Sequence, residues 1–232
     1  MKTILALCLA LAPALLFSTA AGSQTTDPCI KAGETPVLMK AADGATVYGV
    51  EVGTGTTGVV LAHQYFSNHC EFMDFARELA AAGLRALTID FRYNGASTGG
   101  NSSRLDLDVV AAAARLRADG ATRIKLVGAS MGGTAVLVAA SEITPPVDGV
   151  VSLSGPTYFR GMNAVRAVRR SRVPVRFLVA RGERRFAPDA TYLMRAAAAK
   201  DKAIMRVANG GHGSSMLTVP AAKAFVLAFL AR

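Results

Sequence analysis

The residues best suited to chemistry surround Ser130, in the run Gly-Ala-Ser-Met-Gly from Gly128 to Gly132. A largely apolar run at 123–127 precedes it, and an Ala/Val-rich helical pattern follows at 134–140. Small residues two positions before and after a serine let a strand and a helix approach closely around a strained turn. This order predicts a nucleophile elbow, with Gly128 and Gly132 as its small positions and Ser130 as the attacking hydroxyl.

A histidine is the next requirement, because a serine hydroxyl is a poor nucleophile near neutral pH unless a base takes its proton. The chain has three histidines, His63, His69 and His212. His212 alone follows Ser130 in the sequence, and it is flanked by two glycines. We therefore predict His212 as the general base. We expect His63 to shape a loop and His69 to lie on the surface.

The elements that must position these residues alternate along the chain. Asp43-Gly44 predicts a hairpin turn between the first two strands. The alternation predicts an α/β fold with a mostly parallel sheet, an antiparallel N-terminal hairpin and helices on both faces. The expected strands are 37–40, 46–52, 58–62, 85–90, 123–128, 147–153, 174–179 and 202–207, and the expected helices are 70–82, 105–118, 131–141, 188–200 and 219–230.

Polar residues gather where these strands end, as is usual for sites in parallel sheets. Three motifs stand out: His63-Gln64-Tyr65, the run from Gly128 to Gly133, and Gly211-His212-Gly213. With these motifs the chain resembles the α/β-hydrolase superfamily, particularly compact members near the dienelactone-hydrolase and polyester-hydrolase groups. The resemblance covers nearly everything after Thr35 and implies an α/β-hydrolase fold. The connection at 155–173 is short, so we expect no large lid.

The resemblance also implies an oxyanion hole, made by the backbone N–H groups of Tyr65 and Met131. Both side chains are further candidates for the floor of an apolar pocket. The other aromatic candidates for its walls are Phe66, Tyr93, Tyr158 and Phe159.

The third member of a catalytic triad is where the chain departs from the family pattern. Related chains place an aspartate four residues before a proline, and Arg184 stands there, before Pro188. A cation cannot orient an imidazole. Glu183, one residue earlier with a longer side chain, is our first candidate; Asp189 and no acid at all are the alternatives. Asp90, after the fourth strand, is expected to bond loop backbone amides.

The N-terminus has the pattern of an export signal. Lys2 precedes an uncharged apolar run at 4–17 and then small residues, so residues 1–21 predict a signal peptide, too short to favour a membrane anchor. We expect residues 22–34 to be an N-terminal segment and 35–232 the hydrolase domain. The mature protein is then periplasmic or secreted.

Cysteine usage is consistent with export. Cys29 and Cys70 are the only cysteines after the signal, and in an oxidising compartment they are expected to pair, with two buried free thiols as the alternative. A metal site from His63, His69 and Cys70 is less favoured, because no second ligand pair has suitable spacing. We expect neither a metal nor an organic cofactor.

Charge and composition limit the classes of partner that this protein is expected to bind. The 232 residues are 51% hydrophobic with a formal charge of +10, which suits one well-buried domain with an affinity for anionic polymers or surfaces; nucleic acid is not expected for an exported chain. Five arginines lie close together within residues 160–172. They predict either an exposed basic helix or a surface that binds anions.

The sequence predicts an exported serine hydrolase of small or polymer-borne carboxylic esters. The alternatives are a barely catalytic protein that binds an anionic polymer, and a peptidase or thioesterase.

Overall fold

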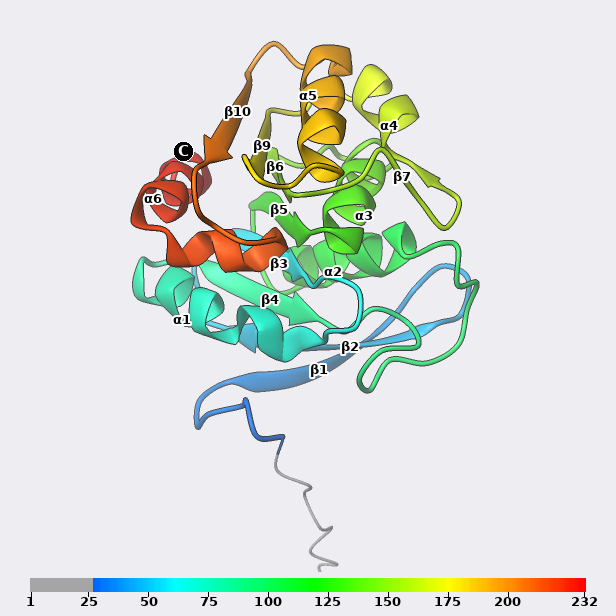
Figure 1. Ribbon diagram of the computed structural model, residues 1–232. Coiled ribbons are helices and arrows are strands. Elements are labelled where there is room, and N and C mark those ends of the chain that lie inside the picture. Colours follow the sequence, from blue (N-terminus) through cyan, green and yellow to red (C-terminus); the bar gives the residue numbers. More distant parts are fainter. Residues whose placement is uncertain (1–26) are drawn as a thin grey trace, which may run out of the picture.

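An eight-stranded sheet forms the centre of the computed structural model, which describes residues 27–232 (Figure 1). The predicted signal peptide lies outside the described residues. The strands run in the order β1-β2-β4-β3-β5-β6-β9-β10. Their bounds are β1 Thr35–Lys40, β2 Thr46–Val52, β3 Thr57–Ala62, β4 Arg85–Ile89, β5 Arg123–Ala129, β6 Gly149–Leu153, β9 Val175–Ala180 and β10 Lys202–Val207.

The sheet has the predicted mixture of directions. Strands β1 and β2 pair antiparallel, and β2 also pairs antiparallel with β4. Every other neighbouring pair is parallel. The first hairpin turns at Gly44, whose φ of +87° is one that glycine adopts without a steric penalty. The carboxyl ends of the parallel strands consequently share one edge of the sheet.

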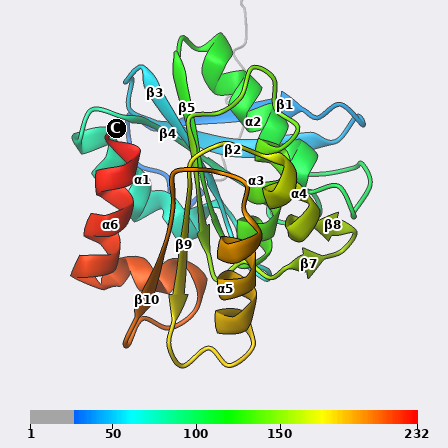
Figure 2. The same cartoon turned by 90° about the horizontal axis from the view of Figure 1, so that it is seen from above.

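Helices cover both faces (Figure 2). One layer holds α1 and α6, whose buried side chains pack in one core with β-strand residues, and the other holds α2 to α5 over a second core. The bounds are η1 His69–Phe72, α1 Met73–Ala81, α2 Asp106–Ala118, α3 Met131–Ala140, α4 Ala164–Arg170, α5 Phe186–Ala196, η2 Gly213–Thr218 and α6 Pro220–Leu230. The predicted α/β-hydrolase architecture is confirmed.

The connection between β6 and β9 holds more structure than the sequence indicated. It contains a short hairpin, β7 Tyr158–Phe159 and β8 Met162–Asn163, followed by α4. The basic helix expected here is present, with its apolar residues buried against the core. This segment is not a large lid. Within residues 27–232, no helix is both long and apolar enough to cross a membrane.

A disulfide joins Cys29 to Cys70, as predicted. It ties the segment before β1 to η1, at the start of α1. Arg77 of α1 reinforces this attachment, because its guanidinium donates to Glu34 at 2.6 Å and to the Cys29 carbonyl at 2.6 Å. The N-terminal segment is therefore held against the domain covalently and by charge.

Candidate active site

Ser130 stands on a strained turn between β5 and α3. Its φ of 48° and ψ of −111° are a backbone conformation that residues other than glycine rarely adopt. The turn needs small neighbours: a Cβ on Gly128 would lie 2.2 Å from the Gly132 carbonyl oxygen, and one on Gly132 would lie 2.2 Å from that of Ala62. The backbone around Ser130 thus has the geometry of a nucleophile elbow.

His212 is held by a carboxylate. Its Nδ1 lies 2.5 Å from Glu183 Oε1, although the two residues come from separate loops after β10 and β9. The other oxygen, Oε2, accepts hydrogen bonds from the Ala180 N–H and the Ser154 hydroxyl, both at 2.7 Å. Burial raises the pKa of Glu183, but the hydrogen bonds from His212, Ala180 and Ser154 outweigh it and hold that pKa below its usual value. Glu183 is therefore a carboxylate at neutral pH.

The structure brings Glu183 to His212 and places the other candidate elsewhere. Asp189 lies in the first turn of α5, where its Oδ2 accepts the Thr157 N–H at 3.1 Å. Arg184, at the position where the family has its acid, is exposed. The longer side chain of Glu183 allows it to reach His212 from one residue earlier in the loop.

Ser154, which the sequence analysis did not single out, joins several parts of the site. It follows β6 with a φ of 52°, and its Oγ donates to Glu183 and accepts the Gly213 N–H at 3.2 Å. The neighbouring Leu153 carbonyl accepts the Ser130 N–H at 2.7 Å. The elbow and the histidine loop therefore both bond to one two-residue segment. The available signal was its position, directly after a strand at the carboxyl edge of the sheet.

Tyr65 and Met131 are among the residues whose backbone N–H groups have no protein acceptor in the described part of the chain. Within residues 27–232, neither the Tyr65 N–H nor the Met131 N–H makes a hydrogen bond, and Ser130 Oγ makes none either. Met131 is the first residue of α3, where N–H groups have no partner inside the helix. These are the two N–H groups predicted to form the oxyanion hole.

His63 shapes the loop that carries Tyr65, as expected. It is fully buried; its Nδ1 donates to the Gln64 carbonyl at 2.6 Å and its Nε2 accepts the Phe91 N–H at 3.0 Å. Burial lowers the pKa of His63, so the imidazole is neutral and suited to this donor and acceptor pairing. His63 thereby links the loops after β3 and β4.

Aromatic side chains and one arginine border the site. The Tyr65 ring lies 3.9 Å from that of Phe66, which is 88% exposed, and 5.8 Å from that of Phe159. Arg160 stacks over Tyr65 and donates to its hydroxyl at 2.9 Å. Phe186, which the sequence analysis did not identify, lies with its ring 4.4 Å from His212. Tyr158 and Tyr93 are exposed, and Tyr93 bonds to the Gly100 carbonyl in its own loop.

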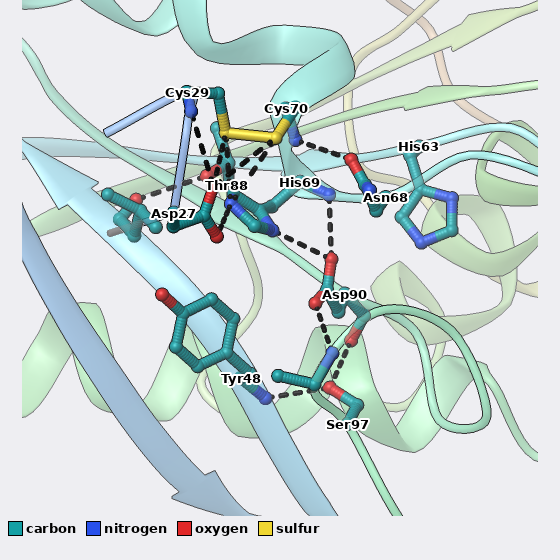
Figure 3. Close-up of polar contacts among 12 residues, drawn as sticks. Asp27, Cys29, Tyr48, His63, Asn68, His69, Cys70, Thr88, Asp90 and Ser97 are labelled. Atoms are coloured by element: carbon teal, nitrogen blue, oxygen red, sulfur yellow. Dashed lines mark hydrogen bonds and ion pairs between the residues drawn. A yellow bond between two sulfur atoms is a disulfide. The ribbon is translucent and has the colours of Figure 1, made fainter. Parts of the chain in front are cut away.

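Asp90 and His69 form a second histidine–carboxylate pair, separate from Glu183 and His212. Asp90 accepts the backbone N–H groups of His69 and Ala96, both at 2.7 Å, which agrees with its predicted role in the loop. His69 is 4% exposed, so the expectation of a surface histidine is wrong. The structural reason is that η1 turns its imidazole inward onto Asp90 (Figure 3).

Comparisons with known proteins agree with this architecture. A family model described as alpha/beta hydrolase fold matches residues 58–203. A search of curated proteins found no match. Among solved structures, an esterase from Pyrococcus furiosus is 18% identical, with a TM-score of 0.77 over 86% of this chain and 92% of its own. A dienelactone hydrolase from Anabaena variabilis is 22% identical, with a TM-score of 0.67 over 84% and 94%. An esterase from Rhodococcus sp. is 16% identical, with a TM-score of 0.69 over 84% and 98%.

Proposed function

The chain belongs to the alpha/beta hydrolase fold family, and we propose that it is an exported serine hydrolase that cleaves carboxylic esters through an acyl-enzyme. The contact between His212 and Glu183 carries this proposal, together with the strained turn at Ser130, because the histidine loop and that turn bond to the same segment, residues 153–154. The esterases and the dienelactone hydrolase of similar fold support an ester as substrate. The disulfide and the predicted signal at residues 1–21 support export.

In the proposed mechanism Ser130 Oγ attacks the acyl carbon while His212 Nε2 takes the hydroxyl proton. Glu183 accepts the hydrogen bond from Nδ1–H, which leaves Nε2 unprotonated for this task. The same carboxylate stabilises the imidazolium as it forms. His212 then returns the proton to the departing alcohol, and water releases the acyl group by the same route.

The negative charge that develops on the carbonyl oxygen needs donors already in place. The backbone N–H groups of Tyr65 and Met131 are assigned this role, because both lack a protein acceptor in the described part of the chain. One such donor contributes about 3 to 4 kcal/mol to the transition state in a measured enzyme. The mechanism uses only groups of the chain itself, without a metal or an organic cofactor.

The surroundings of Ser130 suit an ester that approaches from outside. The aromatic border is exposed at Tyr65 and Phe66, and the β6 to β9 connection adds a small hairpin and a helix. Arg160 adds a positive charge at this border. A small ester, or an ester carried on a polymer, fits these features, with anionic neighbours favoured by the charge of +10.

Replacing the nucleophile tests the proposal. Ser130→Ala is expected to abolish hydrolysis of a short p-nitrophenyl ester and labelling by a fluorophosphonate, because both reactions need the Ser130 oxygen. The melting temperature should stay within a few degrees, since Ser130 Oγ has no hydrogen bond to lose within residues 27–232. Unchanged turnover would contradict the mechanism. A panel of oxygen esters, thioesters and amides would separate an esterase from a thioesterase or peptidase.

A second candidate is a protein that keeps the fold and binds an anionic polymer with little catalysis. The observation that favours it is a surface cavity of about 210 Å³ whose lining includes the exposed Arg166 and Arg170. Arg104 also lines this cavity, but it is paired with Asp106 and Glu142 of the same lining. Failure of the fluorophosphonate to label Ser130, together with salt-sensitive binding to an acidic polymer, would favour this candidate over the enzyme.

A further inference from the structure

An imidazole and a carboxylate are aimed at the two sulfur atoms of the disulfide (Figure 3). His69 Nε2 lies 3.2 Å from Cys29 Sγ and 3.6 Å from Cys70 Sγ. It also lies 3.0 Å from Asp27 Oδ2, while Asp27 Oδ1 is 3.2 Å from Cys29 Sγ. These four residues each bring a ligand atom within 4.8 Å of the others. A disulfide that serves only as a cross-link needs neither group.

Asp90 orients the imidazole of His69 through the ring nitrogen that faces away from the disulfide. Its Nδ1 lies 2.9 Å from Asp90 Oδ1, and Asp90 is fully buried and fixed by two backbone N–H groups. This contact points Nε2 at the sulfur atoms. A carboxylate on the far nitrogen of a ligating histidine is the usual support of a metal-bound imidazole, because it sets the tautomer and the ring direction.

We propose that Asp27, Cys29, His69 and Cys70 bind one thiophilic divalent cation of the zinc class when the disulfide is reduced. Two thiolates, one imidazole nitrogen and one carboxylate oxygen form a tetrahedral donor set of the kind zinc prefers. The site needs no role for Ser130 and does not depend on the proposed hydrolase activity. The set that the sequence disfavoured, His63, His69 and Cys70, shares His69 and Cys70 with this one but lacks Asp27 and Cys29.

The site opens when the Cys29–Cys70 disulfide is reduced. A phosphine reductant supplies two electrons to the S–S bond and takes an oxygen from water, so each sulfur becomes a thiol. The cation then displaces both thiol protons, and any proton on His69 Nε2, to form two metal–sulfur bonds. Two thiolates on one tetrahedral zinc lie about 3.8 Å apart, given Zn–S bonds of about 2.3 Å. The Cα atoms of Cys29 and Cys70 are 5.6 Å apart, so side-chain rotation supplies this separation.

A cation has a route to these ligands. A surface cavity of about 500 Å³ opens beside the cluster, and its lining includes Asp27, His69 and Cys70. Bound there, the cation would join the same two parts of the chain that the disulfide joins. Oxidant and metal are therefore alternative means of fastening the N-terminal segment to η1.

Cobalt(II), which reports on its ligands by absorption, is the first probe. The full protein, reduced with a phosphine and desalted without oxygen, is expected to bind one Co²⁺ with thiolate-to-cobalt charge-transfer bands and the d–d bands of a tetrahedral site. One equivalent of Zn²⁺ should remove both sets of bands. The oxidised protein should show neither. A reduced, folded protein without these bands would overturn the proposal, as would equal bands from Cys29→Ser.

Variants of the carboxylate separate a four-ligand site from binding by two thiols. Asp27→Asn is expected to weaken Zn²⁺ binding about tenfold or more, measured by competition with a chelating dye. Asp74→Asn is the matched control, because Asp74 is 94% exposed on the adjacent helix α1. Asp27 is itself partly exposed, so its variant should fold, which circular dichroism checks. Equal affinities for the two variants would show that Asp27 is not a ligand and overturn the proposed set.

Discussion

Two histidine–carboxylate pairs occupy different environments in this molecule. His212 is 36% exposed and has Glu183 on Nδ1, while its Nε2 has no partner within residues 27–232. His69 is 4% exposed and has a carboxylate at each nitrogen, Asp90 at Nδ1 and Asp27 at Nε2. Burial lowers the pKa of His69, but the two carboxylates outweigh it and raise that pKa above the usual value.

The difference shows what a catalytic pair requires beyond its two residues. An imidazole with one nitrogen oriented and the other open can accept a proton and return it. One with both nitrogens occupied must first break a contact. We therefore propose proton transfer for His212, whereas His69 and Asp90 hold the N-terminal segment and the loop after β4 in place.

The largest expected effect is on turnover. Glu183→Gln should lower kcat for a short p-nitrophenyl ester by about ten-thousandfold, because an amide no longer selects the tautomer or stabilises the imidazolium. Asp189→Asn is the matched control and should change kcat less than threefold, since Asp189 bonds to Thr157 and not to His212. A large loss in Asp189→Asn, or none in Glu183→Gln, would contradict the assignment of the acid.

The next effect is on stability. Asp90→Asn should lower the free energy of unfolding by about 3 kcal/mol, because it removes the buried negative charge that His69 faces. At this chain length the melting temperature should fall by about 6 to 12 °C. Differential scanning calorimetry measures the change, with the exposed Asp74→Asn as control. If Glu183→Gln destabilised the fold more than Asp90→Asn, the division between the two pairs would be wrong.

The smallest expected effect is on the positioning of Glu183 against His212. Ser154→Ala should lower kcat about tenfold with KM nearly unchanged, because it removes one hydrogen bond to Glu183 and the acceptor of the Gly213 N–H without altering the nucleophile. The proton NMR signal of His212 Nδ1–H should shift upfield as its contact with Glu183 loosens. An unshifted signal and an unchanged kcat would mean that Ser154 has no part in positioning the acid.

Much of the fold could be predicted because it depends on local pattern. The strands and helices follow apolar periodicity, and the glycines around Ser130 mark a turn that only small residues permit. Glu183 was also predicted from the sequence, because it directly precedes Arg184, which stands at the usual position of the acid, and because its side chain is longer than that of aspartate. These inferences concern neighbours along the chain.

The rest depends on contacts between distant segments. Ser154 reaches the site only because β6 lies between β5 and β9 in the sheet. Asp27 meets His69 only once the N-terminal segment crosses to η1. His69 was expected at the surface, and its neighbours in the sequence gave no sign of the contact with Asp90, which is 21 residues away. Pairings of this kind arise from strand order and cannot be read from spacing.

The cross-link between Cys29 and Cys70 encloses β1, β2, β3 and the Tyr65 loop in one covalent ring. A protease that cuts once inside this ring leaves both pieces attached, so the severed strands can return to the sheet without diffusing away. A pull on the leading end of the chain passes across the sulfur bridge to η1, and the enclosed strands carry none of it. Attachment to a bead or a cell surface through that end would accordingly shield β1, β2, β3 and the Tyr65 loop from the load.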